Sequence, residues 1–314
     1  MDNFKNISVR LEGGMGDCLL GNRFIPAIKE AYPNSEITAF IDSEGKTFQK
    51  EILDCCYPSF YKEIKIIPNK KYKDFWVDCQ FGTDNYYGAL ENVPDKILSE
   101  MLSYDKFYDL HIDSLKWTKN KTWIKYHRFF PKPHVEPLQT PNRYIVLHLV
   151  SSTSVGHRME EWYIVRLIKE LLERGNFNIK IISTPDTNHF YQNLESKRVE
   201  IINANIKTIV SIIGGAAGMI STDSGFRYLA YGYSIPTLIF SKQSVQPFSA
   251  IPSHQIRWLI FPETCFPLHY DATRVSETLL NCIKNPAQIL VPYVSDFNSQ
   301  CVYRNYIINT ERTK

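Results

Sequence analysis

A glycine-rich turn that ends in a carboxylate is the first feature of the sequence suited to chemistry. Glu12-Gly-Gly-Met-Gly-Asp17 follows a β-like run, Ile7–Leu11, and precedes a run with helical periodicity. Three of four consecutive residues there are glycines, so a ligand could approach the backbone closely. Asp17 suits a general base that deprotonates a bound hydroxyl or, alternatively, a helix N-cap. The turn itself consists of Gly13, Gly14, Met15 and Gly16.

This turn does not fit the dinucleotide-binding fingerprint G-x-G-x-x-G. Counted from Gly14 and Gly16, the third glycine position holds Leu19, whereas a glycine there normally lets helix and strand pack closely. Asp17 would also place a carboxylate where a pyrophosphate should bind, and two anions would compete for the same amides. The sequence therefore favours a base over a dinucleotide site.

Two further turns have residue types that suit phosphate binding. In Thr222-Asp-Ser-Gly225, the Ser224 hydroxyl lies next to the expected N-terminus of a helix, whose amides attract anions. The alternative is that Asp223 or Ser224 is an ordinary N-cap. Ser151-Ser-Thr-Ser154, with His157 and Arg158 after it, offers hydroxyls and cations that could neutralise a diphosphate without a metal. The alternative there is a solvated, serine-rich loop.

The elements that must position these turns alternate between β-branched runs and helical periods, as in parallel sheets covered on both faces. The fold class predicted is therefore α/β, with two Rossmann-like, doubly wound parallel-sheet domains that face a cleft. The strands expected are Ile7–Leu11, Glu36–Ile41, Glu63–Ile67, Tyr108–Ile112, Arg143–Val150, Asn178–Ser183, Val199–Asn203, Gly218–Ser221, Ile235–Phe240 and Ile256–Phe261. The helices expected are Cys18–Ala31, Glu44–Cys55, Glu161–Arg174, Ile206–Ile213, Phe226–Gly232 and Thr273–Lys284.

A proline-rich segment separates the two halves. Pro131–Pro141 contains four prolines in eleven residues, which excludes a helix or a central strand. We therefore expect an N-terminal domain at 1–135, a C-terminal domain at 136–285, and a tail at 286–314. The tail either packs back on the first domain or is poorly ordered. Ligands of open α/β sheets bind at the carboxyl ends of the strands, so loops of both halves should contribute to the site.

Composition excludes several classes of protein. The 314 residues are 44% hydrophobic and 22% charged, which excludes disorder and coiled coil. A net charge of +3 is too small for the whole chain to act as a nucleic-acid binder. The seven cysteines lack C-x-x-C spacing and are expected to be reduced thiols. Because the N-terminus has no signal-peptide core and no apolar run reaches about 18 residues, we expect a cytoplasmic protein without a membrane span.

Taken in order, these pieces resemble glycosyltransferase family 9, the heptosyltransferase-like enzymes of the GT-B fold. Val9-Arg-Leu with Gly14-Met-Gly-Asp17 and, later, Tyr32-Pro33 looks like the family's start. Tyr144-Ile-Val-Leu-His148, the Ser/Thr loop, Arg158 and Glu161-Trp162 look like its central strand, phosphate loop and following helix. Asp223-Ser-Gly225, Leu229-Ala230 and Ile235-Pro236 look like its donor motif.

The resemblance implies a role for each motif. Asp17 would be the base, Ser151, Ser152 and Arg158 or His157 would hold the diphosphate, and Asp223, Ser224 and Gly225 would hold the sugar donor. The reaction would be inverting and independent of metal, and no cofactor is expected. Two departures fall near the donor: Tyr228 replaces the usual histidine, and Ser241-Lys-Gln-Ser244 replaces a Gly-Pro-Thr-like loop. Tyr228 and Lys242 are therefore expected on the donor side.

A basic and aromatic stretch in the first half is the candidate acceptor surface. Lys116–His134 contains six Lys or Arg and no acid, and it is interleaved with aromatic residues. Lys121, Lys125 and Arg128 could contact a polyanion while the rings stack on bases or enter a lipid headgroup layer. The alternative is an amphipathic segment with its rings packed inward.

The function predicted is transfer of a sugar from a nucleotide-sugar to a glycan, glycolipid or other anionic acceptor, with peripheral membrane contact allowed. Modified bases in DNA are an alternative acceptor, and steep salt dependence of binding would support them. A non-catalytic nucleotide-sugar or nucleic-acid binding module is the alternative outside the enzymes, because fold does not dictate function. A nucleotide-sugar epimerase is a further alternative within them.

Overall fold

Two separate parallel sheets organise the chain, one in each of two compact units, Met1–Val135 and Glu136–Lys314. This computed structural model describes residues 6–12, 14–22, 25–26, 29, 33–42, 47–67, 77–79, 102–103, 123–124, 131–149, 159–183, 191, 193–222, 224–242, 256–261 and 271–285. The expected strand Tyr108–Ile112 and the expected tail 286–314 lie outside these residues.

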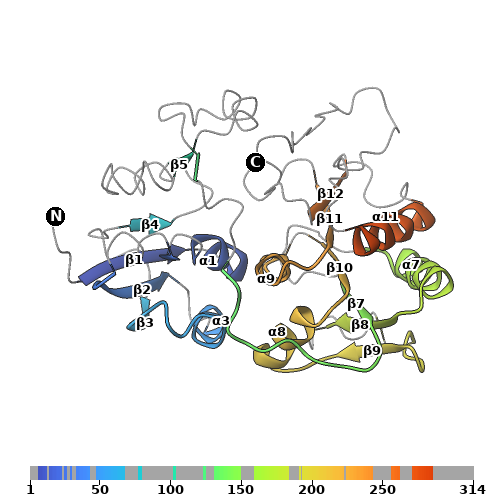
Figure 1. Cartoon of the computed structure of the whole chain (residues 1–314), viewed down its shortest axis with the longest axis horizontal. Helices are drawn as coiled ribbons and strands as arrows, with labels where there is room; N and C mark the ends of the chain where they lie inside the picture. Colours follow the sequence, from blue (N-terminus) through green and yellow to red (C-terminus); the bar gives the residue numbers. More distant parts are fainter. Residues whose placement is uncertain are drawn as a thin grey trace. The chain divides into compact units, whose positions relative to one another are not determined.

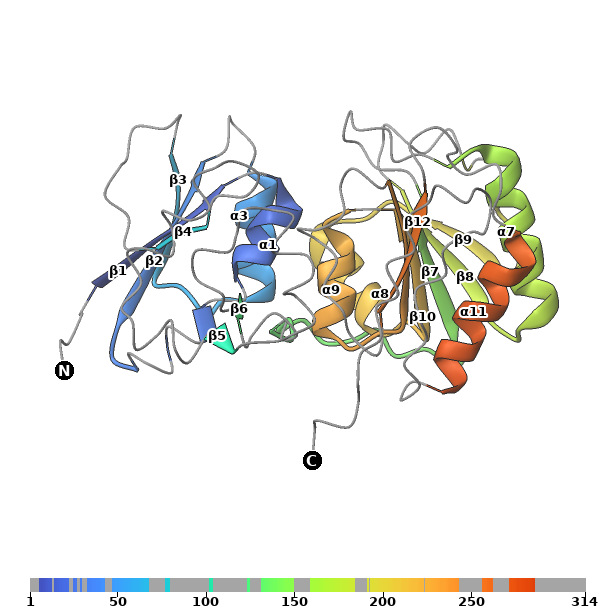
Figure 2. The same ribbon diagram turned by 90° about the horizontal axis from the view of Figure 1, so that it is seen from above.

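The first unit contains a four-stranded parallel sheet in the order β3-β2-β1-β4. Its strands are β1 (Asn6–Glu12), β2 (Glu36–Asp42), β3 (Glu63–Ile67) and β4 (Val77–Cys79). Helices α1 (Met15–Asn22) and α3 (Phe48–Cys56) lie side by side on one face (Figures 1 and 2). Val9, Leu11 and Ala39 are fully buried, so alternate residues of β1 and β2 form the core beneath those helices.

The second unit contains a six-stranded parallel sheet in the order β12-β11-β10-β7-β8-β9. Its strands are β7 (Tyr144–His148), β8 (Asn178–Ile182), β9 (Val199–Ile202), β10 (Gly218–Thr222), β11 (Thr237–Lys242) and β12 (Ile256–Phe261). Counted within this unit, the order is that of a Rossmann sheet, in which the chain winds outward from the centre in both directions.

Helices cover both faces of this sheet. Figure 2 shows α8 (Ile206–Gly214) and α9 (Phe226–Gly232) on one face and α7 (Glu161–Arg174) and α11 (Ala272–Lys284) on the other. All five residues of β7 and all five of β10 are buried, as expected for strands covered on both sides.

Several element boundaries match the prediction, and others differ, as those of β11 do. Strands β3 and β12 and helices α7 and α9 have the expected ends. Strand β11 begins two residues later than expected because the Ile235 N–H donates to the Ala230 carbonyl and Pro236 has no N–H to donate. It also ends two residues later than expected. Lys242 was expected in the loop after this strand and is instead its last residue.

The proline-rich segment is hydrogen bonded on either side of the boundary between the units. The His134 N–H donates to the Cys56 carbonyl in the first unit. In the second unit the Leu138 N–H donates to the Ser211 carbonyl, at 2.8 Å. A Cβ added to Gly215 would lie 2.1 Å from the Leu138 carbonyl oxygen, so this close approach requires a glycine. The segment is therefore bonded to each unit separately.

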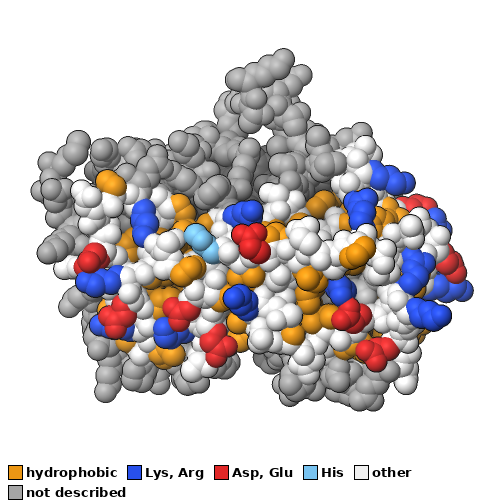
Figure 3. Space-filling view, turned by 60° about the horizontal axis from the view of Figure 1, so that its bottom comes forward, with side chains coloured by type: hydrophobic (Ala, Val, Ile, Leu, Met, Phe, Trp, Pro, Cys, Tyr) orange, Lys and Arg blue, Asp and Glu red, His pale blue; other side chains and the backbone are white. Residues whose placement is uncertain are grey.

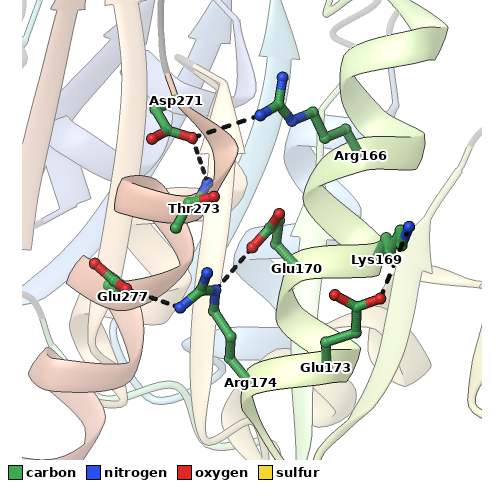
Figure 4. Close-up of polar contacts among 8 residues, drawn as sticks. All are labelled: Arg166, Lys169, Glu170, Glu173, Arg174, Asp271, Thr273 and Glu277. Atoms are coloured by element: carbon green, nitrogen blue, oxygen red, sulfur yellow. Dashed lines mark hydrogen bonds and ion pairs between the residues drawn. The ribbon is translucent and has the colours of Figure 1, made fainter.

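Helices α7 and α11 pack against each other through an apolar interface edged by ion pairs. Arg174 lies between two carboxylates, 2.7 Å from Glu170 and 2.8 Å from Glu277 (Figure 4). Asp271 lies 3.8 Å from Arg166. All of these side chains except Glu170 are at least one third exposed, and exposed ion pairs contribute little to stability. The buried apolar residues between the helices and the sheet must therefore supply most of the stabilisation.

We accordingly expect Leu279→Ala to destabilise the second unit by about 2–5 kcal/mol, because Leu279 is fully buried between α11 and β10. Glu277→Ala, on the exposed face of the same helix, should cost less than about 1 kcal/mol. Urea unfolding of both variants checks this, and similar losses from the two would contradict it.

Candidate functional site

The centre of the six-stranded sheet has the topology of a ligand site. Strands β7 and β10 are adjacent, yet the chain continues from β7 toward β8 on one side and from β10 toward β11 on the other. Such a switch point leaves a crevice at the carboxyl ends of the two strands, where ligands of open α/β sheets bind. The segments that leave these ends are residues 149–160 and the turn at 223–225.

Polar side chains meet at this edge of the sheet. His148 and Ser221 are direct neighbours in register, so both point to the face covered by α8 and α9. His148 Nδ1 lies 2.9 Å from Ser224 Oγ, and Ser224 Oγ lies 3.2 Å from Ser221 Oγ. The turn after β10 is thus hydrogen bonded to the last residue of β7.

His148 is held in an apolar environment. Its ring packs edge-on against Phe226, the first residue of α9, with ring centroids 4.9 Å apart. The side chain is 5% exposed, and burial lowers the pKa of His148 to about 4. The imidazole is therefore neutral at physiological pH, because desolvation disfavours its charged form.

Gly225, and not Ser224, occupies the N-cap position of α9. The role of N-cap, which was the alternative to phosphate binding for Ser224, is therefore wrong. The Ser224 hydroxyl is instead bonded to His148 and Ser221.

Tyr228 is buried within α9 and not exposed at the edge of the sheet. Its hydroxyl accepts a hydrogen bond from Arg227 at 2.6 Å, and its ring meets that of Tyr231 edge-on. The side chain is 4% exposed, so a direct contact with a donor would need this packing to change.

In the first unit, the glycine turn follows the carboxyl end of β1. This strand lies between β2 and β4 in the sheet. Helix α1 begins at Met15, not at Cys18 as expected, and the Cys18 N–H donates to the Gly14 carbonyl at 3.1 Å. Asp17 is therefore the third residue of the helix, so the N-cap role considered for it is wrong. The glycine before Met15 takes the cap position, and a carboxylate in the first turn suits the helix dipole.

Many predicted site residues lie outside the described part of the chain. These are Gly13, Ser151, Ser152, His157, Arg158, Asp223, Lys121, Lys125 and Arg128. The structure describes the basic stretch Lys116–His134 only at Trp123–Ile124 and from Pro131 onward. Trp123–Ile124 forms strand β6, which pairs with β5 (Leu102–Ser103). Lys132 is exposed. Predicted roles for these residues stay predictions.

His148 and Ser221 were not expected in the site. Each is a polar residue at the carboxyl end of a run that is otherwise apolar, which is a signal for a site at the edge of a sheet. The sequence does not reveal that β7 and β10 are neighbours in the sheet, so it could not place His148 and Ser221 together.

Charge and metal-binding groups are dispersed over the described residues. In Figure 3 the Lys and Arg side chains on the visible face are interspersed with Asp and Glu. Ion pairs between described residues include Lys62 with Glu36 and Lys50 with Asp54. Within the described ranges, no three His, Cys, Asp or Glu side chains are grouped to hold a metal ion. No helix in that part of the chain is long and apolar enough to cross a membrane.

The low pKa of His148 makes stability depend on pH. In the unfolded chain its pKa is near 6.5, against about 4 in the folded protein, so between these values the unfolded state binds more protons. The free energy of unfolding therefore keeps its full value above about pH 6.5 and decreases as the pH falls toward 4. We expect a loss of about 2 kcal/mol from pH 7.5 to pH 5, measured by urea unfolding. His148→Asn has no titrating ring and should lose less, whereas an equal loss would contradict this.

Comparison with known proteins identifies the fold. No protein-family model matches the sequence, and no curated protein matches it. Solved structures do match. A glycosyl transferase family 9 structure from Veillonella parvula is 12% identical, with a TM-score of 0.56, over 91% of this chain and 98% of that one. Escherichia coli ADP-heptose lps heptosyltransferase II is 12% identical, with a TM-score of 0.58, over 90% of this chain and 100% of that one.

Escherichia coli heptosyltransferase WaaC with ADP is 15% identical, with a TM-score of 0.55, and covers 90% of this chain and 99% of that one. The likeness extends over both units, and both sheets are parallel α/β structures. This confirms the predicted fold class and, at the level of the fold, the resemblance seen in the motifs. The chain has the GT-B fold of the family 9 glycosyltransferases.

Proposed function

We propose that this protein is a glycosyltransferase that moves a sugar from a nucleotide-sugar donor to a glycan or glycolipid acceptor. The observation that carries the proposal is the place of the two motif turns. Each follows the carboxyl end of a central strand, β1 or β10, in a chain whose fold is similar to heptosyltransferase structures over 90% of its length. One of those structures contains ADP.

The donor is assigned to the second unit. Its diphosphate would lie at the switch point between β7 and β10, where hydroxyls and cations can stabilise the negative charge without a metal. The residues proposed for this side are Ser151, Ser152, His157, Arg158, Asp223, Ser224, Gly225, Tyr228 and Lys242.

The reaction proposed is a single displacement with Asp17 as general base. The carboxylate takes the proton of an acceptor hydroxyl as that oxygen attacks the anomeric carbon of the sugar. The bond from this carbon to the diphosphate oxygen breaks on the opposite face, and the nucleoside diphosphate leaves with the electron pair. Attack opposite the leaving group inverts the anomeric configuration, and a positioned base lowers the barrier of such a step.

The acceptor is assigned to the first unit. The glycine turn after β1 would let the acceptor approach the backbone, and Lys121, Lys125 and Arg128 give this half a cationic stretch that favours an anionic acceptor. DNA is the alternative acceptor with the same charge, and it predicts binding that weakens steeply with salt.

Replacing the proposed base tests this function. Asp17→Asn should lower the rate of sugar transfer by about 10²–10⁴-fold, because it removes the proton acceptor, and leave nucleotide affinity unchanged. The assay follows release of the nucleoside diphosphate and the mass of the acceptor, with and without a chelator.

Asp54→Asn is the matched control, since Asp54 is a half-exposed aspartate of the same unit that forms an ion pair with Lys50 one turn earlier in α3. It should keep full activity. Full activity of Asp17→Asn would remove Asp17 from the mechanism, and loss of activity in chelator would contradict independence from metal.

A further inference from the structure

A chain of hydrogen bonds connects β7, the turn after β10 and β10 itself. It runs from His148 Nδ1 to Ser224 Oγ at 2.9 Å and from Ser224 Oγ to Ser221 Oγ at 3.2 Å. It ends at the Thr222 carbonyl oxygen, 2.7 Å from Ser221 Oγ. Three polar side chains from two adjacent strands and one turn are therefore paired with one another.

The number of protons determines the direction of this chain. A carbonyl oxygen only accepts, so Ser221 uses its single hydroxyl proton on Thr222. The contact between the two serines then needs Ser224 as its donor. With its own proton used in this way, Ser224 can only accept from His148, so Nδ1 of the imidazole must carry a hydrogen. The neutral ring then has its lone pair on Nε2.

We propose that His148 is a positioning residue that holds the donor turn, through the bond from its Nδ1–H to Ser224. This inference rests on the proposed function, in which the turn 223–225 binds the nucleotide-sugar. It also refines the role of Ser224, because a hydroxyl whose proton is committed to Ser221 orients the turn and does not donate to a phosphate.

The surroundings of His148 make the ring a rigid support. The edge of Phe226 restricts it on one side, and the Thr222 hydroxyl donates to the His148 backbone carbonyl at 3.4 Å. The side chain stands at the end of a strand whose five residues are all buried. Sites work well when the groups around the contact residues are held by packing, and His148 is 5% exposed and packed against Phe226.

The direction of the bonds can be observed without a ligand. Nitrogen-15 NMR correlation of the imidazole rings distinguishes a protonated Nδ1 from a protonated Nε2. We expect one histidine with hydrogen on Nδ1 whose signal is lost in His148→Asn and shifted in Ser224→Ala. A ring with hydrogen on Nε2 at this position would overturn the proposed direction and the positioning role.

Binding of ADP and of UDP, measured by calorimetry, tests the consequence for the donor. His148→Phe should weaken binding of the preferred nucleotide tenfold or more. His148→Asn should stay within threefold of the wild type, because its amide can donate to Ser224 from the place of Nδ1. Ser224→Ala should lose as much as His148→Phe, and the double variant should lose no more than either.

Three results would contradict the positioning role: unchanged affinity in His148→Phe, equal losses in the Asn and Phe variants, or additive losses in the double variant. Glu277→Ala, at an exposed residue of α11 in the same unit, is the control and should bind like the wild type. Failure of the wild type to bind either nucleotide would overturn the proposed function and the positioning role with it, while the NMR result would still decide the direction of the bonds.

Discussion

The parallel pairing of β7 with β10 is the interaction on which the rest of the second unit depends. About seventy residues of sequence separate these two strands. Strands β8 and β9 extend the sheet on one side of the pair, and β11 and β12 extend it on the other. Because the chain leaves the pair in opposite directions, the two connections diverge at the carboxyl ends. The site follows from that divergence.

Burial determines which residue types β7 and β10 can contain and at which positions polar residues are tolerated. Both strands are buried along their length, so a polar side chain costs free energy unless it finds a hydrogen-bond partner. His148 and Ser221 stand at the ends of their strands, where the turn can supply one in Ser224. The same burial keeps the imidazole neutral, and a neutral ring has both a donor and an acceptor nitrogen.

Periodicity allowed most of the elements to be predicted, and tertiary contacts account for the differences. The amphipathic pattern of α7 and the short apolar run of β12 placed their ends correctly. In α7 the pattern agrees with burial, since Ile164, Leu167 and Leu171 are buried. The start of α1 was missed because Gly14 takes the cap position ahead of Met15, so the helix begins within the glycine turn. The pairing of β5 with β6 was not expected, since nothing local joins Leu102–Ser103 to Trp123–Ile124.

The candidate site was predicted in part. Residue types and spacing picked out the turns after β1 and β10, because glycines and small polar residues at strand ends are local signals. The hydrogen bond from His148 to Ser224 joins residues 76 positions apart, and it depends on a strand order that the sequence does not display. Motif matching therefore found the turns but not the side chain that holds one of them.

A crystal structure of the protein with a nucleoside diphosphate tests the central claim most directly, because it locates the ligand. We expect the diphosphate at the carboxyl ends of β7 and β10, within hydrogen-bond distance of the turn at 223–225. A nucleotide bound elsewhere, or none bound at millimolar concentration, would contradict it.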